Sequence, residues 1–482
     1  LLSRGLGDVY KRQVLYHRHQ YARIEIFKNH FYIKEYDENV YEIIYKLKKY
    51  AESGIKNYTH SVDLWMKNSG LIIDCDEKKN ALRNLFKNSK VAFIYGAAGT
   101  GKSTMINYIS SLFKDKQKIF LANTNPAVEN LRRKVTAEHA EFVTITKFLS
   151  KDVSNDCDIL CLDECSTISN RDMVRVLQRA QCKLLVLVGD IYQIESILFG
   201  NWFNIAYKVM PKDSVAELTR PHRTTVQGLI EVWNKVREIT EDRLEFITRN
   251  GLSSTLDESI FSRTEEDEIV LCLNYDGIYG INNINKFLQS NNVNPSINWG
   301  VLSYKVGDPV LFNESNRFAP LVYNNLKGKI LQIEEEEDCI YFTIEVYTVL
   351  NELDVIGFDL ELKESVTDET SVIRFKVGRG GDGNDDNDNV ENVVPFQVAY
   401  AISIHKAQGL EYESVKVVIT SEIEEMVSHN IFYTAITRAK SKLKIYWSPE
   451  TEKRILENMK VQFNDKDYQL FKAKYKEALL KS

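Results

Sequence analysis

One short stretch of the sequence, residues 96–103, has the residue types and spacing of a phosphate-binding loop. It reads GAAGTGKS and lies between the apolar run VAFIY and the helix-like run TMINYISSLF. Glycines in such a loop let backbone N–H groups converge on phosphates at the start of a helix, where a lysine and a hydroxyl can assist. A glycine-rich turn without a ligand is the alternative, and the flanking strand and helix patterns argue against it. We therefore expect ATP and Mg²⁺ here, held by Gly96, Gly99, Gly101, Lys102, Ser103 and Thr104.

Acidic and amide side chains follow the later apolar runs. Asp163 and Glu164 come directly after DILCL, and Gln193 comes shortly after KLLVLVGD. Polar residues just beyond parallel strands face the crevice in which such sheets bind ligands. We predict that Asp163 joins Ser103 in orienting Mg²⁺ and that Glu164 takes a proton from the attacking water, while Lys102 reaches the β and γ phosphates. Gln193 is predicted to sense the γ-phosphate or the water, and an acidic helix cap is the alternative for the carboxylate pair.

The elements that must position these residues show as apolar runs alternating with helical stretches. Four runs, VAFIY, KIFLAN, DILCLDE and KLLVLVGD, precede residue 191, and three more, EIVLCLN, KVVIT and KLKIYW, follow residue 267. Strands that are apolar on both faces are typical of parallel sheets with helical crossovers. The fold class is therefore predicted to be α/β, with two parallel-sheet lobes.

Changes in residue composition and hydrophobic pattern along the chain predict its domain boundaries. The predicted parts are an amino-terminal region of unknown role with short strands and a helix near 39–51 (1–70), a first lobe (71–212), a second lobe in two pieces (213–302 and 396–450), a β-rich insertion (303–395) and a helical tail packed on the second lobe (451–482). The run GRGGDGNDDNDN inside the insertion is predicted to be a solvated loop. Because the chain begins with Leu1, we interpret it as a fragment whose residues 1–13 are candidates for non-native sequence.

Composition excludes several classes of protein. The 482 residues are 44% hydrophobic and 27% charged, which excludes wholesale disorder, a collagen-like fibre and a small disulfide scaffold. No apolar run is long enough for a membrane span. The net charge of −6 neither supports nor excludes a nucleic-acid partner. Cys157, Cys161 and Cys165 lie in a strand-like run without a nearby histidine, so core residues of a cytoplasmic protein are favoured over a zinc site.

Six runs in order resemble the motifs of superfamily 1 helicases, most closely the RecD-like branch, from about residue 71 to residue 447. They are GAAGTGKS, LDECS, GDIYQIES, ELTRPHRT, SIHKAQGLEYESV and YTAITRAK. The resemblance implies two RecA-like lobes and hydrolysis of ATP. It further implies that Arg223 contacts the γ-phosphate and that Arg438 is an arginine finger from the second lobe. In the fifth run, Gly409 would permit close backbone approach to the nucleotide and Glu411 would meet the ribose.

The same resemblance implies a track for single-stranded nucleic acid. Thr124 and Asn125 in TNPAVENL suit phosphate contacts, although helix capping by Asn125 explains the same residues. His405 and Lys406 carry over as nucleic-acid contacts, with core packing as the alternative. Trp202 could stack on a base, and a buried tryptophan is the alternative. Two runs in the insertion, YKVGDPVLFNESN and NNLKGKILQI, resemble an SH3-like module, with an unrelated β-insertion as the alternative.

The sequence departs from the family pattern at three places. Lys78 stands where the family carries a glutamine that reads adenine, which puts nucleotide selectivity in doubt. Thr146 replaces the family's histidine at a position assigned to the nucleic-acid track. About seven residues separate Ser150 from the strand of the second motif, too few for the β-hairpin wedge of many relatives.

The motifs together predict a motor that uses ATP to move on single-stranded DNA, 5′ to 3′, and unwinds duplexes or displaces proteins. An RNA-directed motor of the same superfamily is one alternative, because contacts to the backbone discriminate poorly between the two polymers. A regulatory P-loop ATPase without nucleic acid is the other. The fifth and sixth motifs disfavour it, since a switch with one core needs no second lobe.

Overall fold

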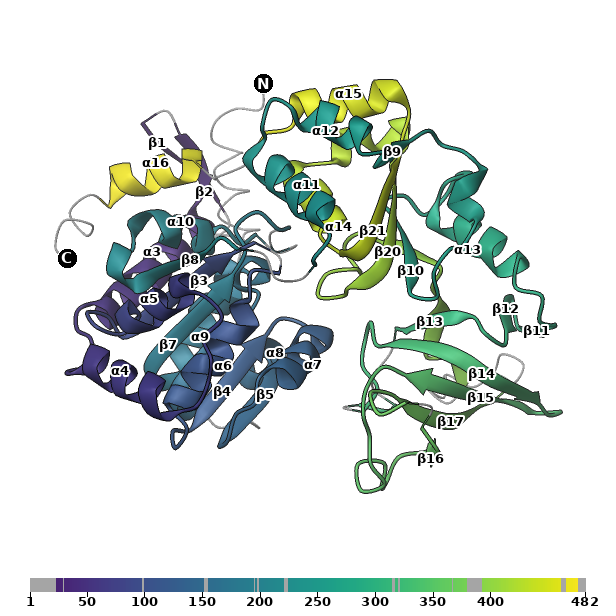
Figure 1. Cartoon of the computed structure of the whole chain (residues 1–482), viewed down its shortest axis with the longest axis horizontal. Coiled ribbons are helices and arrows are strands. Elements are labelled where there is room, and N and C mark those ends of the chain that lie inside the picture. The colour runs from purple at the N-terminus through teal and green to yellow at the C-terminus, as the bar shows by residue number, and fades with distance from the viewer. Residues whose placement is uncertain are drawn as a thin grey trace, which may run out of the picture. The chain divides into compact units, whose positions relative to one another are not determined.

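The computed structural model describes residues 23–475, apart from 29, 98, 151–154, 195, 197–198, 221–223, 314–316, 320, 366, 379–391 and 461–464. The chain forms two compact units (Figure 1). The first contains residues up to Arg223 and those from Val461 onward, and the second contains Thr224–Lys460. No helix in the described part of the chain is long and apolar enough to cross a membrane.

The first unit is built on a parallel sheet with the strand order β5-β4-β6-β7-β3-β8. The strands are β3 (Val91–Gly96), β4 (Lys118–Ala122), β5 (Ala140–Thr144), β6 (Asp156–Leu162), β7 (Gln181–Gly189) and β8 (Val215–Leu218). The four predicted strands are confirmed as β3, β4, β6 and β7. Alternate residues of β3 enter two separate cores, with Phe93 in one and Ile94 in the other, so both faces are covered as an all-parallel sheet requires.

Helices cover the two faces of this sheet. They are α4 (Tyr58–Asn68), α5 (Asp76–Asn84), α6 (Lys102–Leu112) and α7 (Asn125–Lys134) against one core, and α3 (Lys34–Ala51), α8 (Ile145–Leu149), α9 (Asn170–Arg179) and α10 (Trp202–Val209) against the other. The predicted amino-terminal helix is therefore real and begins five residues earlier than residue 39. It follows a hairpin of β1 (Ile24–Phe27) and β2 (His30–Ile33).

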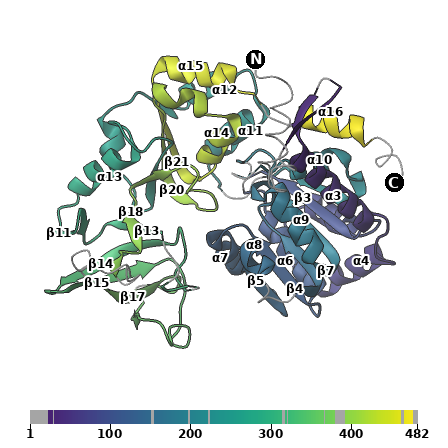
Figure 2. The same cartoon turned by 180° about the vertical axis from the view of Figure 1, so that it is seen from behind.

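The carboxy-terminal tail divides between the two units, contrary to the prediction that all of it packs on the second lobe. Helix α15 (Pro449–Asn458) stays with the second unit, whereas α16 (Asp465–Lys474) packs on the first (Figure 2). Phe471 enters the core that α3 also lines. Asp37 of α3 accepts hydrogen bonds from the Lys474 ammonium and, at 2.7 Å, from the Tyr475 hydroxyl. Asp37 and Phe471 thus both bind the tail to the first unit, and the apolar spacing of the tail did not indicate the contact with Asp37.

The second unit contains a smaller parallel sheet with the order β19-β10-β20-β21-β9. Its strands are β9 (Ser253–Ser254), β10 (Glu268–Cys272), β19 (Ala401–Ser403), β20 (Tyr412–Val418) and β21 (Ala439–Tyr446), and its helices are α11 (Gln227–Glu238), α12 (Arg243–Arg249), α13 (Ile281–Ser290), α14 (His429–Ile436) and α15. The three predicted strands are confirmed. The predicted boundary at residue 213 is wrong, because β8 pairs with β3 and extends the first sheet.

The insertion is an antiparallel sheet with the order β16-β17-β15-β14-β13-β18. Its strands are β13 (Pro309–Phe312), β14 (Lys327–Glu335), β15 (Cys339–Val346), β16 (Glu361–Lys363), β17 (Ser371–Gly378) and β18 (Phe396–Val398), preceded by the hairpin β11 (Ser296–Trp299) and β12 (Leu302–Lys305). Buried aromatic rings, including Phe342 and Phe375, form its core. The β-rich insertion is thus confirmed. Its SH3-like type stays a prediction, and most of the acidic run GRGGDGNDDNDN lies outside the described residues.

Short 3₁₀ helices complete the fold: Cys165–Thr167, Lys212–Ser214, Glu258–Phe261 and Ser421–Met426. All seven cysteines are free thiols. Burial raises the pKa of the Cys161 and Cys165 thiols well above the ordinary value.

Candidate functional site

The predicted phosphate loop joins the end of β3 to the start of α6. Gly99 and Gly101 adopt φ angles of 77° and 84°, in the left-handed region that favours glycine. At Gly96 a side chain would collide with the Thr100 hydroxyl, since a Cβ there would lie 2.4 Å from Oγ1. The Lys102 ammonium donates to the carbonyls of Gly96 at 2.8 Å and Ala97 at 3.0 Å. Two loop carbonyls therefore hold the Lys102 ammonium beside the turn.

Helix α6 presents its amino-terminal end to this loop. Its first hydrogen bond within the helix runs from the Met105 N–H to the Gly101 carbonyl, at 3.0 Å. The N–H groups in the first turn of any helix are available to outside acceptors, and the helix dipole favours a negative charge there. Ser103 and Thr104 lie in that turn and are partly exposed. The loop and the helix thus offer phosphates a site of backbone donors beside Lys102.

Two carboxylates stand at the carboxyl end of β6. The Asp163 N–H bonds to the Leu121 carbonyl of the neighbouring strand, at 2.8 Å, and one Asp163 carboxylate oxygen accepts from the Glu164 N–H, at 2.9 Å. Burial raises the pKa of Asp163, while the Glu164 N–H and the charge of Lys102 oppose that rise. Because Lys102 acts on this pKa, the carboxylate and the phosphate loop share one electrostatic environment.

The alternative role of these carboxylates, as caps of the following helix, is not what the structure shows. The cap of α9 is Ser169, whose hydroxyl oxygen accepts from the Asp172 N–H at 3.0 Å. Glu164 instead adopts a left-handed φ of 53°, which is uncommon for a residue with a side chain. Such strain is concentrated at functional positions, and Glu164 follows directly on Asp163.

Gln193 follows the carboxyl end of β7, the strand between β6 and β3. Its side-chain amide donates to Asp190 at 3.4 Å, and Asp190 also accepts from the Tyr192 N–H at 3.0 Å. Gly189 lets this strand end approach the turn after β6, since a Cβ there would lie 3.2 Å from the Cys165 nitrogen. The structure therefore brings the loop, the carboxylate pair and the amide to three neighbouring strand ends, as the sequence predicted.

Lys78 contributes to this neighbourhood in a way that the sequence analysis missed. Its side chain is 1% exposed and forms an ion pair of 2.5 Å with Asp74. Its ammonium lies against Gly101, because a Cβ on that glycine would be only 2.4 Å from Nζ. The signal was present in α5, where Lys78 precedes the buried Leu82 by four residues and so lies on the inward face of the helix.

In the second unit, the fifth motif forms the turn between β19 and β20. His405 is exposed, so the alternative that it packs in the core is wrong. Lys406 is half-buried, and its ammonium donates to the side chains of Gln397 at 3.0 Å and Asn313 at 3.2 Å in the insertion. Burial lowers the pKa of Lys406. The pair therefore presents one exposed imidazole and one lysine held by the β-insertion.

The resemblance also singled out Gly409, Glu411 and Arg438 in this unit. Gly409 has a φ of 76°, and the Glu411 carbonyl accepts from the Lys327 ammonium at 3.3 Å. Arg438 is 3% exposed, and its guanidinium donates to the carbonyls of Thr434 at 3.0 Å and Leu410 at 3.1 Å. Arg438 thus ties the sixth motif to the fifth. Arg223 lies outside the described residues.

The predicted nucleic-acid residues of the first unit have different surroundings. Thr124, and not Asn125, caps α7, because its hydroxyl oxygen accepts from the Ala127 N–H at 3.4 Å. Asn125 and Thr146 are exposed. The prediction that Trp202 stacks on a base is wrong: its ring is fully buried, and its Nε1–H donates to the Ile168 carbonyl at 3.0 Å.

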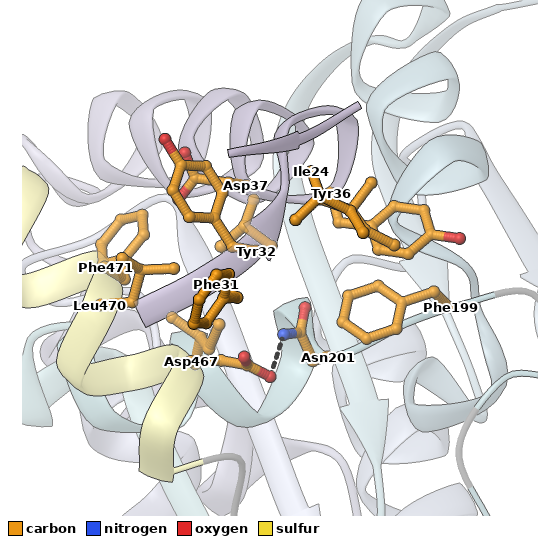
Figure 3. A pocket seen from close by; sticks show the side chains of 13 residues that line it. Ile24, Phe31, Tyr32, Tyr36, Asp37, Phe199, Asn201, Asp467, Leu470 and Phe471 are labelled. Atoms are coloured by element: carbon orange, nitrogen blue, oxygen red, sulfur yellow. Dashed lines mark hydrogen bonds between the residues drawn. The ribbon is translucent and has the colours of Figure 1, made fainter. Parts of the chain in front are cut away.

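A separate apolar pocket of about 330 Å³ lies in the first unit, where β2, α3 and α16 meet the segment before α10 (Figure 3). The Tyr36 and Phe199 rings stack at its edge, with centroids 4.2 Å apart. The Asn201 amide donates to Asp467 of α16 at 2.9 Å. The residues that line this pocket were not predicted to be functional.

Two family models match the chain. The AAA domain model covers residues 75–257, which include the phosphate loop, the carboxylate pair and Gln193. The UvrD-like helicase C-terminal domain model covers residues 398–446, which include the fifth and sixth motifs. The matches follow one another in the order of the predicted motifs.

Curated relatives are similar over most of this chain. An uncharacterised protein of Methanocaldococcus jannaschii is 24% identical over 76% of the chain, and the chain spans only 37% of that protein's length. The RecBCD enzyme subunit RecD of Buchnera aphidicola subsp. Schizaphis graminum is 23% identical over 80% of this chain and 78% of its own. The ATP-dependent DNA helicase Pif1 of Campylobacter jejuni is 23% identical over 73% of this chain and 88% of its own.

Among solved structures, the Pif1 helicase from Candida albicans aligns with a TM-score of 0.49 and 18% identity, covering 84% of this chain and all of that one. The two family models, the RecD and Pif1 relatives and the six motifs agree with one another. Together they support a superfamily 1 helicase of the RecD and Pif1 type.

Proposed function

We propose that the chain is an ATP-dependent motor that moves on single-stranded DNA, with duplex unwinding or protein displacement as its output. The observation that carries this proposal is the meeting of the phosphate loop, Asp163, Glu164 and Gln193 at neighbouring strand ends of one sheet. A similarity to relatives named RecD and Pif1 supports the DNA substrate. The exposed His405 favours a motor over a regulatory ATPase, because a switch has no use for a second parallel-sheet unit with its own exposed imidazole.

In the proposed hydrolysis step, the first unit binds the triphosphate through the loop and the first turn of α6. Ser103 and Asp163 supply oxygen atoms of the kind that Mg²⁺ prefers, and the ion would neutralise charge on the phosphates. Glu164 takes the proton from the attacking water, and Gln193 orients that water. Arg223 and Arg438 are proposed as the cations that stabilise charge on the transferred phosphoryl, on the pattern of the family.

The nucleic-acid track is proposed to use Thr124 and Asn125 at the start of α7, together with Thr146, His405 and Lys406. The amino-terminal end of α7 suits a phosphate group, because its dipole and first-turn N–H groups favour an anion. These contacts follow the nucleic-acid backbone, so an RNA-directed motor is the second candidate.

Gly409 and Glu411 are proposed to contact the bound ATP and not the nucleic acid.

Turnover of ATP with no polymer, single-stranded DNA, single-stranded RNA and duplex DNA would test the proposal. We expect single-stranded DNA to stimulate turnover most. Equal stimulation by RNA would favour the RNA-directed motor, and stimulation by none would favour the regulatory ATPase. Glu164→Gln is the control for contaminating ATPases.

The direction of movement is proposed to be 5′ to 3′, from the resemblance to the RecD-like branch. Displacement of streptavidin from oligonucleotides biotinylated at one end would test it. We expect clearance of the 3′ end, and selective clearance of the 5′ end would contradict the proposed direction.

A further inference from the structure

The buried ammonium of Lys78 lies beside the phosphate loop, where it pairs with Asp74. Lys78 lies in the first turn of α5, and its Nζ contacts Gly101, the residue that caps α6. The ammonium is therefore close to the amino-terminal ends of two helices, both of which carry partial positive charge. Cations are destabilised at such ends unless an anion lies nearby.

The carboxylate that compensates Lys78 is incompletely enclosed. Asp74 forms the 2.5 Å ion pair, but its own side chain is 36% exposed, whereas the Lys78 side chain is 1% exposed. The neighbouring loop contributes a second ammonium, that of Lys102, which donates to the carbonyls of Gly96 and Ala97. Lys78 and Lys102 thus both lie next to Gly101 of the phosphate loop.

The chemistry of the side chain limits what Lys78 can recognise. An ammonium has three donors and no acceptor, so it cannot accept a hydrogen bond from the amino group of adenine. It can donate to phosphate oxygens of a nucleotide carrying any base, as a point charge. Gly101 suits this contact, because its φ of 84° is rarely adopted by residues with a side chain and because a Cβ there would displace Nζ.

We propose that Lys78 is a second phosphate-binding lysine of the nucleotide site, which Asp74 holds against Gly101 and which recognises the polyphosphate without regard to the base. This inference rests on the proposed function, since it assumes that the loop binds a nucleoside triphosphate. It adds that the site discriminates weakly between ATP and GTP.

The test compares Lys78→Met with Lys79→Met, a matched control on the same helix. Lys79 pairs with Asp76 at 3.1 Å and is 43% exposed, away from the loop. KM and kcat would be measured with ATP and with GTP, and inorganic tripolyphosphate would serve as a competitor. Lys78→Met should raise both KM values and the inhibition constant of tripolyphosphate by the same factor, about tenfold or more, because a charge-assisted hydrogen bond is lost. Lys79→Met should change none of them, and Lys78→Arg should restore part of the loss.

Two results would overturn the proposal. A rise in KM for ATP alone, with GTP and tripolyphosphate unaffected, would show that Lys78 reads the base. Unchanged constants in a folded Lys78→Met variant would show that the lysine is only structural. Binding of ADP and tripolyphosphate to Glu164→Gln gives a readout that does not depend on movement, so failure of the motor proposal would be recognised separately.

If Lys78→Met fails to fold, Asp74→Asn provides the second variant. It leaves the buried ammonium without its carboxylate, so a bound anion becomes its main counter-charge. Inorganic tripolyphosphate should then raise the Tm of Asp74→Asn by more than it raises the Tm of the wild type. An equal or smaller rise would contradict a contact between Lys78 and phosphate.

Discussion

The two parallel-sheet units hold their candidate residues in different ways. In the first unit, loop, carboxylates and amide follow neighbouring strand ends, and Glu164 and Gln193 are partly exposed. In the second unit, Arg438 is buried and bonded to the carbonyls of Leu410 and Thr434. The first arrangement is preorganised to receive an anion, whereas the second holds its arginine in internal bonds. We therefore expect the first unit to account for nucleotide binding and turnover to need residues of both units.

The largest expected effect comes from the first unit. Lys102→Ala and Glu164→Gln should each nearly abolish ATP hydrolysis, because one removes the phosphate cation and the other the base. Glu164→Gln should still bind nucleotide, since the phosphate cradle is intact. Steady-state turnover and titration with a fluorescent ADP analogue would check both statements. Turnover like that of the wild type in either variant would overturn the assignment of the site.

Variants of the two proposed arginines, Arg438 of the second unit and Arg223 at the end of the first, test the step that follows binding. Arg438→Ala and Arg223→Ala should lower kcat by roughly 10³ or more and change nucleotide affinity only modestly, since both are proposed to act on transition-state charge. Single-turnover kinetics beside equilibrium binding would separate the two quantities. A variant that lost binding but kept its kcat would contradict the proposed action of that arginine on transition-state charge.

Unwinding should depend strongly on duplex stability. Helix α8 ends at Leu149 and β6 begins at Asp156, which leaves little chain for a wedge at this place. A motor without a wedge relies on fraying, where each base-pair step costs about 1.4 kcal/mol. We expect fast translocation on single strands and slow unwinding that falls steeply with GC content. Equal rates on single strands, AT-rich forks and GC-rich forks would show that another element, such as the insertion, acts as a wedge.

The smallest effect concerns the cap of α7. Thr124→Ala should destabilise the first unit by about 1 kcal/mol, through loss of the cap, and should also weaken binding of single-stranded DNA. Ser448→Ala is a matched control, because Ser448 caps α15 in the second unit by the same kind of bond. Denaturant unfolding and DNA titration would be run on both variants. If both bound DNA like the wild type, Thr124 would be a cap and nothing more.

Elements with strong apolar runs could be predicted from the sequence, and weakly marked ones could not. The strands β3 and β7 were visible because they are buried on both faces. The strand β8 is only four residues long, and β5 is half-exposed, so neither has such a run. Missing β8 misplaced the boundary between the units, since this strand completes the first sheet beside β3.

The site followed the same rule. Residues placed by a strand end, such as Asp163, were found because motif and topology agree. Trp202 was misread because aromatic residues serve in cores and on stacking surfaces alike, and a motif nearby does not decide between them. The inward position of Lys78 could be predicted from its spacing to Leu82, but its role depends on contact with Gly101, 23 residues away in the sequence, which only the fold reveals.

The return of α16 to the first unit has a consequence for synthesis on the ribosome. The core that contains Val40 of α3 is completed by Phe471, and between them the chain passes through the whole second unit. The second unit can therefore fold before the core of the first unit is complete, because all strands of the second unit have already left the ribosome. Until residues near 471 leave the exit tunnel, the apolar surface around α3 and α10 stays uncovered and available to chaperones. Translation that stops after α15 would yield a folded second unit joined to a first unit whose core lacks α16.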